Sequence, residues 1–397
     1  MAGVVVVGAG HAAGALAVAL RDGGYADPIA LIGDEPHPPY ERPPLSKGLL
    51  RGTDAFEGAL VRPREWYSEA GVALHLGRRA VAVDPAGGTV QLDGGDRLDF
   101  TNLVFATGLT PLRLGIPGAG LPGIHVLRTW ADCQAIAAAA APGGRVVVVG
   151  AGLVGLEVAA TLRVGGSTVT VLEAAPRPLA RVLPALVADH VAGLHRARGV
   201  DLRCDASVAA FVGDGRLRSV VLTSGQALPA DLAIVAIGSA PNDRLARAAG
   251  LEVRDGIVVD AGCRASLPSI HAIGDVARHR SARFDREWRL ESWHNAQEQA
   301  ATCARTILGV AQPRAKVPTF WTDQYDTTVQ FAGLTNATTE AELQGDPATG
   351  AFSVLCRLGG ELVGVVGVNR PKDVRQARIA IEAGSSPSQN SHDRKQP

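Results

Sequence analysis

One stretch constrains the fold of this chain more than any other. Residues 145–173 read RVVVVGAGLVGLEVAATLRVGGSTVTVLE. The β-branched run Val146–Val149 is typical of a strand that is buried on both faces of a sheet. Gly150, Gly152 and Gly155 then give GxGxxG, whose glycines permit a sharp turn, the approach of a pyrophosphate and close packing of the following helix. The pattern predicts a strand, a tight turn and a helix in succession.

The remainder of this stretch points to nucleotide binding. The helix that begins around Val154 offers free N–H groups and the positive end of its dipole to phosphates. Glu173 ends the next strand about 20 residues after the glycines, where a carboxylate can bind a ribose 2′-hydroxyl. We therefore predict a dinucleotide site here; the alternative is a glycine-rich turn in an ordinary α/β unit.

The N-terminus repeats this design, since VVVVGAG occurs at residues 4–10 and again at 146–152. Such self-similarity indicates two copies of one βαβ unit. After the strand Ile29–Ile32, the acid of the first copy must be Asp34 or Glu35, and we favour Asp34. The other candidate contacts of the first copy are Gly8, Gly10, Ala12, Ala13 and, one residue later than usual, Gly14. We expect two dinucleotides, or one bound twice; the alternative is that one copy has lost its ligand.

Two further apolar strands end in glycine, at Gly108 and at Gly238. A turn of small residues, such as Thr107-Gly108, lets the backbone approach a ligand. We predict an α/β chain with two Rossmann-like domains, the second inserted into the first. The expected boundaries are 1–109 with 240–318 for the first domain, 110–239 for the second, 319–384 for a C-terminal α+β domain and 385–397 for a disordered polar tail.

Composition excludes several classes of protein. The formal net charge is zero, which argues against nucleic acid or an anionic membrane as the main partner. The chain has no apolar run of about 18 residues and no basic segment before its first strand, so we expect neither a transmembrane helix nor a signal peptide. Its five cysteines are scattered without a CxxC pair. This excludes zinc, iron–sulfur and redox-disulfide motifs, and we expect no metal site and a reducing cytoplasm.

Beyond the two glycine turns, other motifs resemble one known family. They are DEPHPPYERPPLSK (34–47), FATG (105–108), LRT (127–129), VGAGLVGLEVAA (149–160), IGDVA (273–277), ESWHNAQEQA (291–300) and FWTDQYD (320–326). With them, the chain resembles the FAD-dependent, NADH-using ferredoxin reductases of bacterial oxygenase systems. These include the reductase components of aromatic-ring dioxygenases and of putidaredoxin-type P450 chains, whose fold is glutathione-reductase-like.

The resemblance implies a role for particular residues. The first copy, with Asp34, would bind the ADP part of FAD, and the second copy, with Glu173, would bind NADH. Lys47 would lie beside the isoalloxazine and pair with Glu157, which makes these two the candidate catalytic residues. The remaining contacts implied for the flavin nucleotide are Ala80, Thr107, Arg128, Gly274-Asp275 for the ribityl chain and Trp293 for the pyrimidine end. From the residues alone, the proline-rich loop that carries Arg42 and Lys47 either folds over a cofactor or is solvated.

The partners follow from this chemistry. Glu173 favours NADH because it would repel a 2′-phosphate, whereas Arg177 and Arg181 either accept that phosphate or grip the NADH pyrophosphate. Without a disulfide to relay electrons, a reduced flavin must pass them directly to an outside acceptor, and a one-electron [2Fe–2S] ferredoxin matches. The candidate docking face is the basic segment Arg278–Arg289 with Trp321; the alternative is a solvated hairpin. The chain is expected to be a monomer or a homodimer.

Three other functions compete with that of a ferredoxin reductase. A rubredoxin reductase is the nearest alternative enzyme. A flavoprotein that senses NADH, like apoptosis-inducing factor, would turn over slowly and need no ferredoxin. An NADH oxidase or peroxidase requires a reactive cysteine near the flavin, and residues 38–50 contain none.

Overall fold

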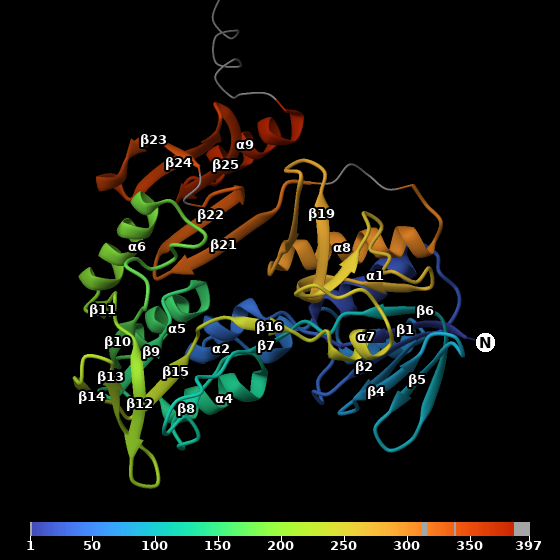
Figure 1. Cartoon of the computed structure of the whole chain (residues 1–397), viewed down its shortest axis with the longest axis horizontal. Coiled ribbons are helices and arrows are strands. Elements are labelled where there is room, and N and C mark those ends of the chain that lie inside the picture. The colour runs from blue at the N-terminus through green and yellow to red at the C-terminus, as the bar shows by residue number, and fades with distance from the viewer. Residues whose placement is uncertain (1, 312–315, 337–338, 385–397) are drawn as a thin grey trace, which may run out of the picture. The chain divides into compact units, whose positions relative to one another are not determined.

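The computed structural model describes residues 2–311, 316–336 and 339–384, so the tail predicted at 385–397 lies outside the described residues. Contacts divide the chain into two compact units (Figure 1). Unit 1 contains the described residues of 1–43, 55–110 and 239–315, and unit 2 contains those of 44–54, 111–238 and 316–397. The short strands β7 (Leu109–Pro111) and β16 (Ser239–Pro241) lie where the chain passes from one unit to the other.

Unit 1 is built on a parallel sheet in the order β3-β2-β1-β6, with β18 pairing with β6 as well. Its strands are β1 (Gly3–Val7), β2 (Ile29–Gly33), β3 (Val72–Leu76), β6 (Arg97–Phe105) and β18 (Ile270–Ala272). All five residues of β1 are buried, as the sequence VVVV predicts for a strand covered on both faces. Helices α1 (His11–Asp22) and α8 (Trp293–Ile307) pack against each other and share a core around Leu16 and Ala300.

Shorter elements complete unit 1. The strands β5 and β4 extend the main sheet by antiparallel pairing, and β17, β19 and β20 form a separate small sheet. The bounds are β4 (Ala80–Asp84), β5 (Thr89–Leu92), β17 (Ile257–Val259), β19 (Ala277–Ser281), β20 (Arg286–Arg289), α3 (Arg64–Glu69) and α7 (Arg244–Ala248). A 3-10 turn, η3 (Gly274–Val276), follows β18 directly.

Unit 2 repeats the parallel design in the order β11-β10-β9-β15-β8. Its strands are β8 (Ile124–His125), β9 (Arg145–Val149), β10 (Thr168–Leu172), β11 (Asp201–Arg203) and β15 (Leu232–Val235). The helices are α2 (Gly48–Arg51), α4 (Trp130–Ala139), α5 (Leu153–Val164) and α6 (Ala185–Ala197), and β12 (Val208–Gly213), β13 (Leu217–Leu222) and β14 (Ala227–Pro229) form an antiparallel sheet. Residues 44–54 group with this unit because α2 packs on α4 and α5. The sequence instead predicts that residues 44–54 belong to the first domain, which includes 1–109. The domain boundaries given in the sequence analysis therefore remain predictions.

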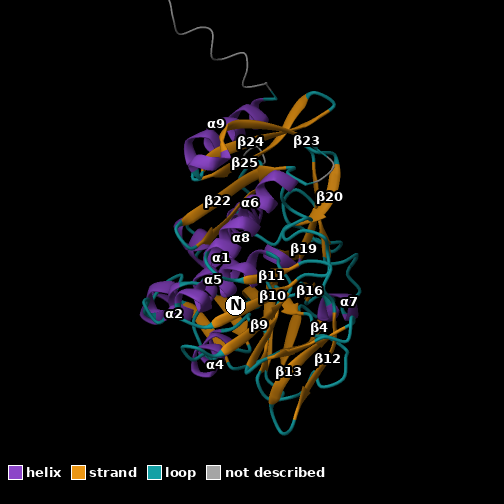
Figure 2. Cartoon of the chain, turned by 90° about the vertical axis from the view of Figure 1, so that its left-hand side faces the viewer, coloured by secondary structure: helices purple, strands orange, loops and turns teal. Residues whose placement is uncertain are grey.

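The last part of unit 2 is an antiparallel sheet in the order β21-β22-β25-β24-β23. Its strands are β21 (Thr319–Gln324), β22 (Thr327–Gly333), β23 (Glu340–Asp346), β24 (Ala351–Leu358) and β25 (Glu361–Val368). Helix α9 (Pro371–Ala383) packs on β22 and β25, as Figure 2 shows. Two parallel α/β sheets and one antiparallel sheet with a helix confirm the predicted fold class.

Leucines at the turn between β24 and β25 give a matched test of this core. Leu362 is 2% exposed, whereas Leu358, across the same turn, is 52% exposed. We expect Leu362→Ala to lower the free energy of unfolding by about 2–5 kcal/mol, because it removes buried methyl groups and leaves a cavity. Leu358→Ala should change it by about 0.5 kcal/mol or less. Equilibrium unfolding in urea measures both, and equal losses would contradict the packing described.

Candidate dinucleotide and redox sites

The first glycine of each copy sits in the same strained turn. Gly8 has φ +115° and Gly150 has φ +105°. A Cβ on Gly8 would lie 2.2 Å from the carbonyl oxygen of Ala106, and one on Gly150 would lie 2.3 Å from that of Ala236. Only glycine fits these positions, because both the backbone angle and the neighbouring strand exclude a side chain.

The second glycine of each copy faces open space. Gly10 and Gly152 are the N-caps of α1 and α5, with extended backbone and no side-chain capping bond. A Cβ added to either would meet nothing within 4 Å. Free helix N–H groups beside open backbone are what a diphosphate needs. Both turns therefore fit the pyrophosphate of a dinucleotide.

The third position distinguishes the copies. In the second copy, a Cβ on Gly155 would lie 2.1 Å from the carbonyl oxygen of Gly150, so the helix packs tightly on the turn. In the first copy, Ala13 is fully buried at the usual place of this glycine. Gly14 instead makes room for the loop, since its Cβ would lie 2.7 Å from Cβ of Pro39. Beside these turns, Ala12 is buried and Val154 is exposed.

The two candidate acids of the first copy have different surroundings. Asp34 is largely exposed and lies 3.1 Å from Arg79. Glu35 accepts hydrogen bonds from Arg42 at 2.6 Å and from the Tyr40 hydroxyl at 2.5 Å. Burial acts to raise the pKa of Glu35, but these hydrogen bonds together with the positive charge of Arg42 outweigh it and lower the pKa below its ordinary value. Asp34 therefore keeps the more accessible carboxylate, as we predict for the ribose contact.

The acid of the second copy lies directly beside its glycine turn. The Glu173 carboxylate accepts hydrogen bonds from the backbone N–H of Ala151, at 2.7 Å, and of Ala175, at 2.9 Å. Of the two arginines that follow, Arg177 pairs with Asp189 at 3.0 Å and Arg181 is exposed. The structure thus brings the predicted turn and the predicted acid of this copy together.

The other predicted cofactor contacts divide between the two units. In unit 1, Thr107 donates to the backbone of Asn242 at 2.7 Å, and the N–H of Gly274 donates to Gln299 at 2.7 Å. Gly108 and Gly274 have positive φ, as sharp turns beside a ligand require. Also in unit 1, Ala80 begins β4, Asp275 lies in η3 and Trp293 begins α8. Lys47, Arg128 and Gly238 belong to unit 2.

A histidine in the first turn was not singled out from the sequence. His11 follows Gly10, is 8% exposed and stacks on Trp293 with ring centroids 5.0 Å apart. Neither of its ring nitrogens has a hydrogen-bond partner among the described residues. Burial lowers the pKa of His11 to about 4, so the ring is neutral near pH 7. An imidazole directly after the second glycine of such a turn is the signal that could have found it.

Lys47 and Glu157 form an ion pair within unit 2. The Lys47 Nζ lies 2.7 Å from Oε1 of Glu157 and 3.1 Å from Oδ2 of Asp323. Glu157 also accepts hydrogen bonds from Ser46, at 2.5 Å, and from Thr322, at 2.6 Å. Its side chain is 8% exposed, against 23% for Lys47. Burying a carboxylate costs free energy unless hydrogen-bond donors surround it. Ser46, Lys47 and Thr322 all donate to Glu157 here.

The predicted docking segment is a hairpin formed by β19 and β20, and its charges are largely paired. Arg278 pairs with Glu287, Arg280 with Asp285, and Arg289 with Glu291. Two further arginines of the hairpin, at 283 and 286, lie over aromatic rings. Local partners therefore satisfy much of the basic charge that the sequence shows.

The cysteines are not placed for redox chemistry. All five are described and free, and four are buried. Burial raises the pKa of Cys263 to about 12 and that of Cys303 well above its ordinary value. Thiolate is the reactive form of cysteine, so these thiols are inert near pH 7.

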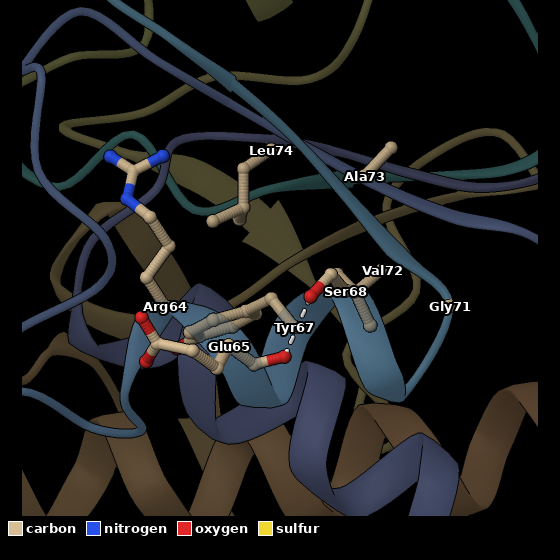
Figure 3. A pocket seen from close by; sticks show the side chains of 8 residues that line it. All are labelled: Arg64, Glu65, Tyr67, Ser68, Gly71, Val72, Ala73 and Leu74. Carbon is tan, nitrogen blue, oxygen red and sulfur yellow. Dashed lines mark hydrogen bonds between the residues drawn. The ribbon is translucent and has the colours of Figure 1, made fainter.

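A separate hollow of about 690 Å³ lies between α3 and β3 in unit 1. Figure 3 shows Arg64, Tyr67 and Leu74 around it, with the Ser68 hydroxyl donating to the backbone of Glu65. None of its lining residues belongs to the predicted sites. In the described part of the chain, no helix is long and apolar enough to cross a membrane.

Two parallel sheets, each with a glycine turn open to a diphosphate, define a protein that fits two dinucleotides. Residues 2–300 match the family described as pyridine nucleotide-disulphide oxidoreductase, and residues 319–395 match the reductase C-terminal family. This chain belongs to the pyridine nucleotide-disulphide oxidoreductase family. Members of that family use FAD and NAD(P)H.

Individual relatives agree over nearly the whole chain. A ferredoxin–NAD(P)(+) reductase from Sphingomonas sp is 42% identical, covering 96% of this chain and 92% of its own length. The ferredoxin–NAD(+) reductase component of an anthranilate 1,2-dioxygenase system from Burkholderia cepacia is 41% identical, covering 96% and 95%. The crystal structure of a covalent putidaredoxin reductase–putidaredoxin complex has a TM-score of 0.94 at 36% identity, covering 96% and 93%. The expected resemblance to the reductases of oxygenase systems is confirmed.

The second glycines allow the two turns to be tested separately. Gly10 and Gly152 have backbone angles that alanine adopts, so substitution should leave the fold intact. We expect Gly10→Ala to be purified with much less FAD, because its methyl group would occupy the diphosphate position. Gly152→Ala should keep FAD but weaken NADH binding about tenfold or more. Flavin absorbance and NADH titration measure the two effects.

Gly193→Ala is the matched control, since it also faces open space but lies within α6. It should change neither FAD content nor NADH affinity. Loss of NADH affinity with full FAD content in Gly10→Ala would reverse the assignment of the two turns.

Proposed function

We propose that this chain passes electrons from NADH through FAD to a [2Fe–2S] ferredoxin that feeds an oxygenase. The observation that carries this proposal is the pair of glycine turns, each with an open second glycine and a nearby acid. The names of the relatives support the proposal, because one is a ferredoxin–NAD(P)(+) reductase and another is the ferredoxin–NAD(+) reductase component of an anthranilate 1,2-dioxygenase system. The reaction is therefore NADH:ferredoxin oxidoreduction.

Each part of the chain has a role in this reaction. FAD, when bound, accepts a hydride from NADH and releases two electrons one at a time. The first turn, with Asp34, holds the ADP part of FAD, and the second turn, with Glu173, holds NADH. Lys47 supplies a fixed positive charge for the hydride-transfer step, and Glu157 with Asp323 orients its ammonium group. The ion pair is a poor device for stability alone, because burying it costs desolvation.

The state of the cysteines indicates which kind of electron acceptor this chain uses. The family description includes a disulphide, yet every cysteine of this chain is free and four of the five are buried. With no thiol pair to receive two electrons, an external group would have to accept them directly from a bound flavin. A [2Fe–2S] centre accepts single electrons and suits this requirement.

Coenzyme choice rests on Glu173. Its carboxylate lies at the second turn, where it can bind a ribose hydroxyl and would repel a 2′-phosphate. Arg177 pairs with Asp189, which leaves the exposed Arg181 to contact the NADH pyrophosphate. We therefore propose NADH as the physiological donor.

For the ferredoxin, we propose docking at the hairpin 278–289 and at Trp321. The hairpin carries five arginines against Asp285 and Glu287, and the guanidinium groups of Arg283 and Arg286 lie over Phe284 and Trp288. An excess of positive charge steers an acidic partner and raises its association rate. We propose that the active form is a monomer or a homodimer.

A ferredoxin-dependent assay tests the main proposal against its alternatives. The FAD-loaded protein is reduced anaerobically with NADH or NADPH, and a [2Fe–2S] ferredoxin is added with cytochrome c as the final acceptor. We expect NADH to reduce the flavin and ferredoxin to accelerate cytochrome c reduction. A faster response to rubredoxin would favour a rubredoxin reductase. Slow turnover with a stable flavin–NAD charge-transfer band, unaffected by either acceptor, would favour an NADH sensor.

The role of Lys47 has a direct test. Lys47→Met keeps the length of the side chain but removes its charge, and we expect flavin reduction by NADH to slow about tenfold or more. Stopped-flow absorbance measures the rate. Lys372→Met on the exposed surface of α9 is the matched control and should reduce its flavin at the wild-type rate. Identical rates for both variants would remove Lys47 from the mechanism.

A further inference from the structure

A chain of buried hydrogen bonds leads away from the Lys47–Glu157 pair within unit 2. The Thr322 hydroxyl lies 2.6 Å from Oε1 of Glu157, and Nε2 of Gln324 lies 2.8 Å from the Thr322 hydroxyl. Oε1 of Gln324 is 3.0 Å from Nε2 of His195, whose Nδ1 is 3.2 Å from the Tyr325 hydroxyl. Five side chains from α5, α6, β21 and the turn that follows β21 are thus linked in series.

The charge of Glu157 sets the direction of every bond in this chain. An ionised carboxylate only accepts, so Thr322 must give its single hydroxyl proton to Glu157. The Thr322 oxygen can then only accept from Gln324, which must present its amide nitrogen. The Gln324 oxygen consequently faces His195 and requires a proton on Nε2.

The direction of the last hydrogen bond, between His195 and Tyr325, follows in the same way. A neutral imidazole that carries its proton on Nε2 has an acceptor at Nδ1, so the Tyr325 hydroxyl donates there. Burial lowers the pKa of His195 to about 4 and raises that of Tyr325 to about 12, so near pH 7 one group is neutral and the other keeps its proton. Arg198 lies over the Tyr325 ring at 5.0 Å and pairs with Asp326, which holds this end in place.

We propose that Gln324 and His195 are positioning residues for the Lys47–Glu157 ion pair. Thr322, Gln324 and His195 are each 0% exposed, so no water replaces a lost partner. Dipoles that all point toward one buried carboxylate polarise each other and hold Glu157 in one orientation. Glu157 in turn holds the Lys47 ammonium. The inference rests on the proposed function, since it gives these residues a task in the hydride-transfer step.

The protonation of His195 can be observed without any turnover. Uniform ¹⁵N labelling of the oxidised, FAD-loaded protein gives ring-nitrogen signals for its ten histidines, and His195→Gln assigns the signal of interest. We expect His195 to be neutral at pH 7 with the proton on Nε2. A proton on Nδ1, or on both nitrogens, would overturn the direction derived above.

Two substitutions at His195 separate positioning from packing. His195→Gln can still donate an amide proton to Gln324, whereas His195→Leu fills similar space and leaves the Gln324 oxygen without a donor. We expect His195→Leu to slow flavin reduction by NADH about tenfold and His195→Gln to slow it about twofold or less. KM for NADH should stay near the wild-type value in both, because neither touches the second glycine turn.

A matched control addresses stability. Ser353 on β24 is 0% exposed and donates to Asp373, so Ser353→Ala also removes a buried hydrogen bond from unit 2. It should lower the melting temperature without slowing flavin reduction. If His195→Leu does not fold, Gln324→Met takes its place with the same expected rate loss. Equal rates for His195→Gln and His195→Leu would overturn the proposal.

The position of Lys47 provides a readout that does not depend on the proposed function. The chain has four lysines, so selective ¹⁵N-lysine labelling yields few signals. We expect a protected Lys47 ammonium signal in wild type and in His195→Gln, and rapid exchange in His195→Leu. Wild-type protein that NADH fails to reduce would defeat the proposed function alone, whereas unchanged Lys47 protection in His195→Leu would defeat this inference.

Discussion

A single buried carboxylate organises unit 2. Glu157 lies on α5, two residues after the last glycine of the second turn, and its side chain is 8% exposed. A charge at that depth requires donors on all sides. They come from two distant segments: Ser46 and Lys47 in the proline-rich loop, and Thr322 on β21, whose neighbour Asp323 pairs with Lys47. Hydrogen bonds and an ion pair to this one carboxylate therefore connect the loop 44–54 and the C-terminal sheet to the part of unit 2 that carries the second glycine turn.

The two dinucleotide units show how far one local design can be reused. In both, the first glycine adopts a positive φ against the end of a neighbouring strand, and the second faces open space. They diverge where each meets its own unit. The first copy places Ala13 at the third position and uses Gly14 to admit Pro39, whereas the second keeps Gly155 against its own turn. Features on the open side of the turn are shared, and features that face the core differ.

Sequence reasoning succeeded where structure is local. The glycine turns, their flanking strands and the fold class follow from spacing and periodicity over about 30 residues. The pairing of Lys47 with Glu157 came from the family resemblance, since 110 positions separate the two residues. The partners Ser46, Thr322 and Asp323 were missed because no spacing rule links Thr322 to a residue 165 positions away. The sequence does not reveal the ion pairs within the basic hairpin, because they depend on the register of β19 and β20.

Strand alternation explains how β21 can serve two tasks at once. Thr322 and Gln324 are fully buried, while Trp321 and Asp323 are partly exposed, as a period of two requires. One face of the strand thus carries the hydrogen bonds that end at Glu157, and the other carries the tryptophan proposed to meet ferredoxin. An apolar core at Thr322 and Gln324 would be easier to stabilise, because buried polar groups gain little once desolvation is counted. Under the proposed function, this polar set orients the Lys47 ammonium group for the hydride-transfer step.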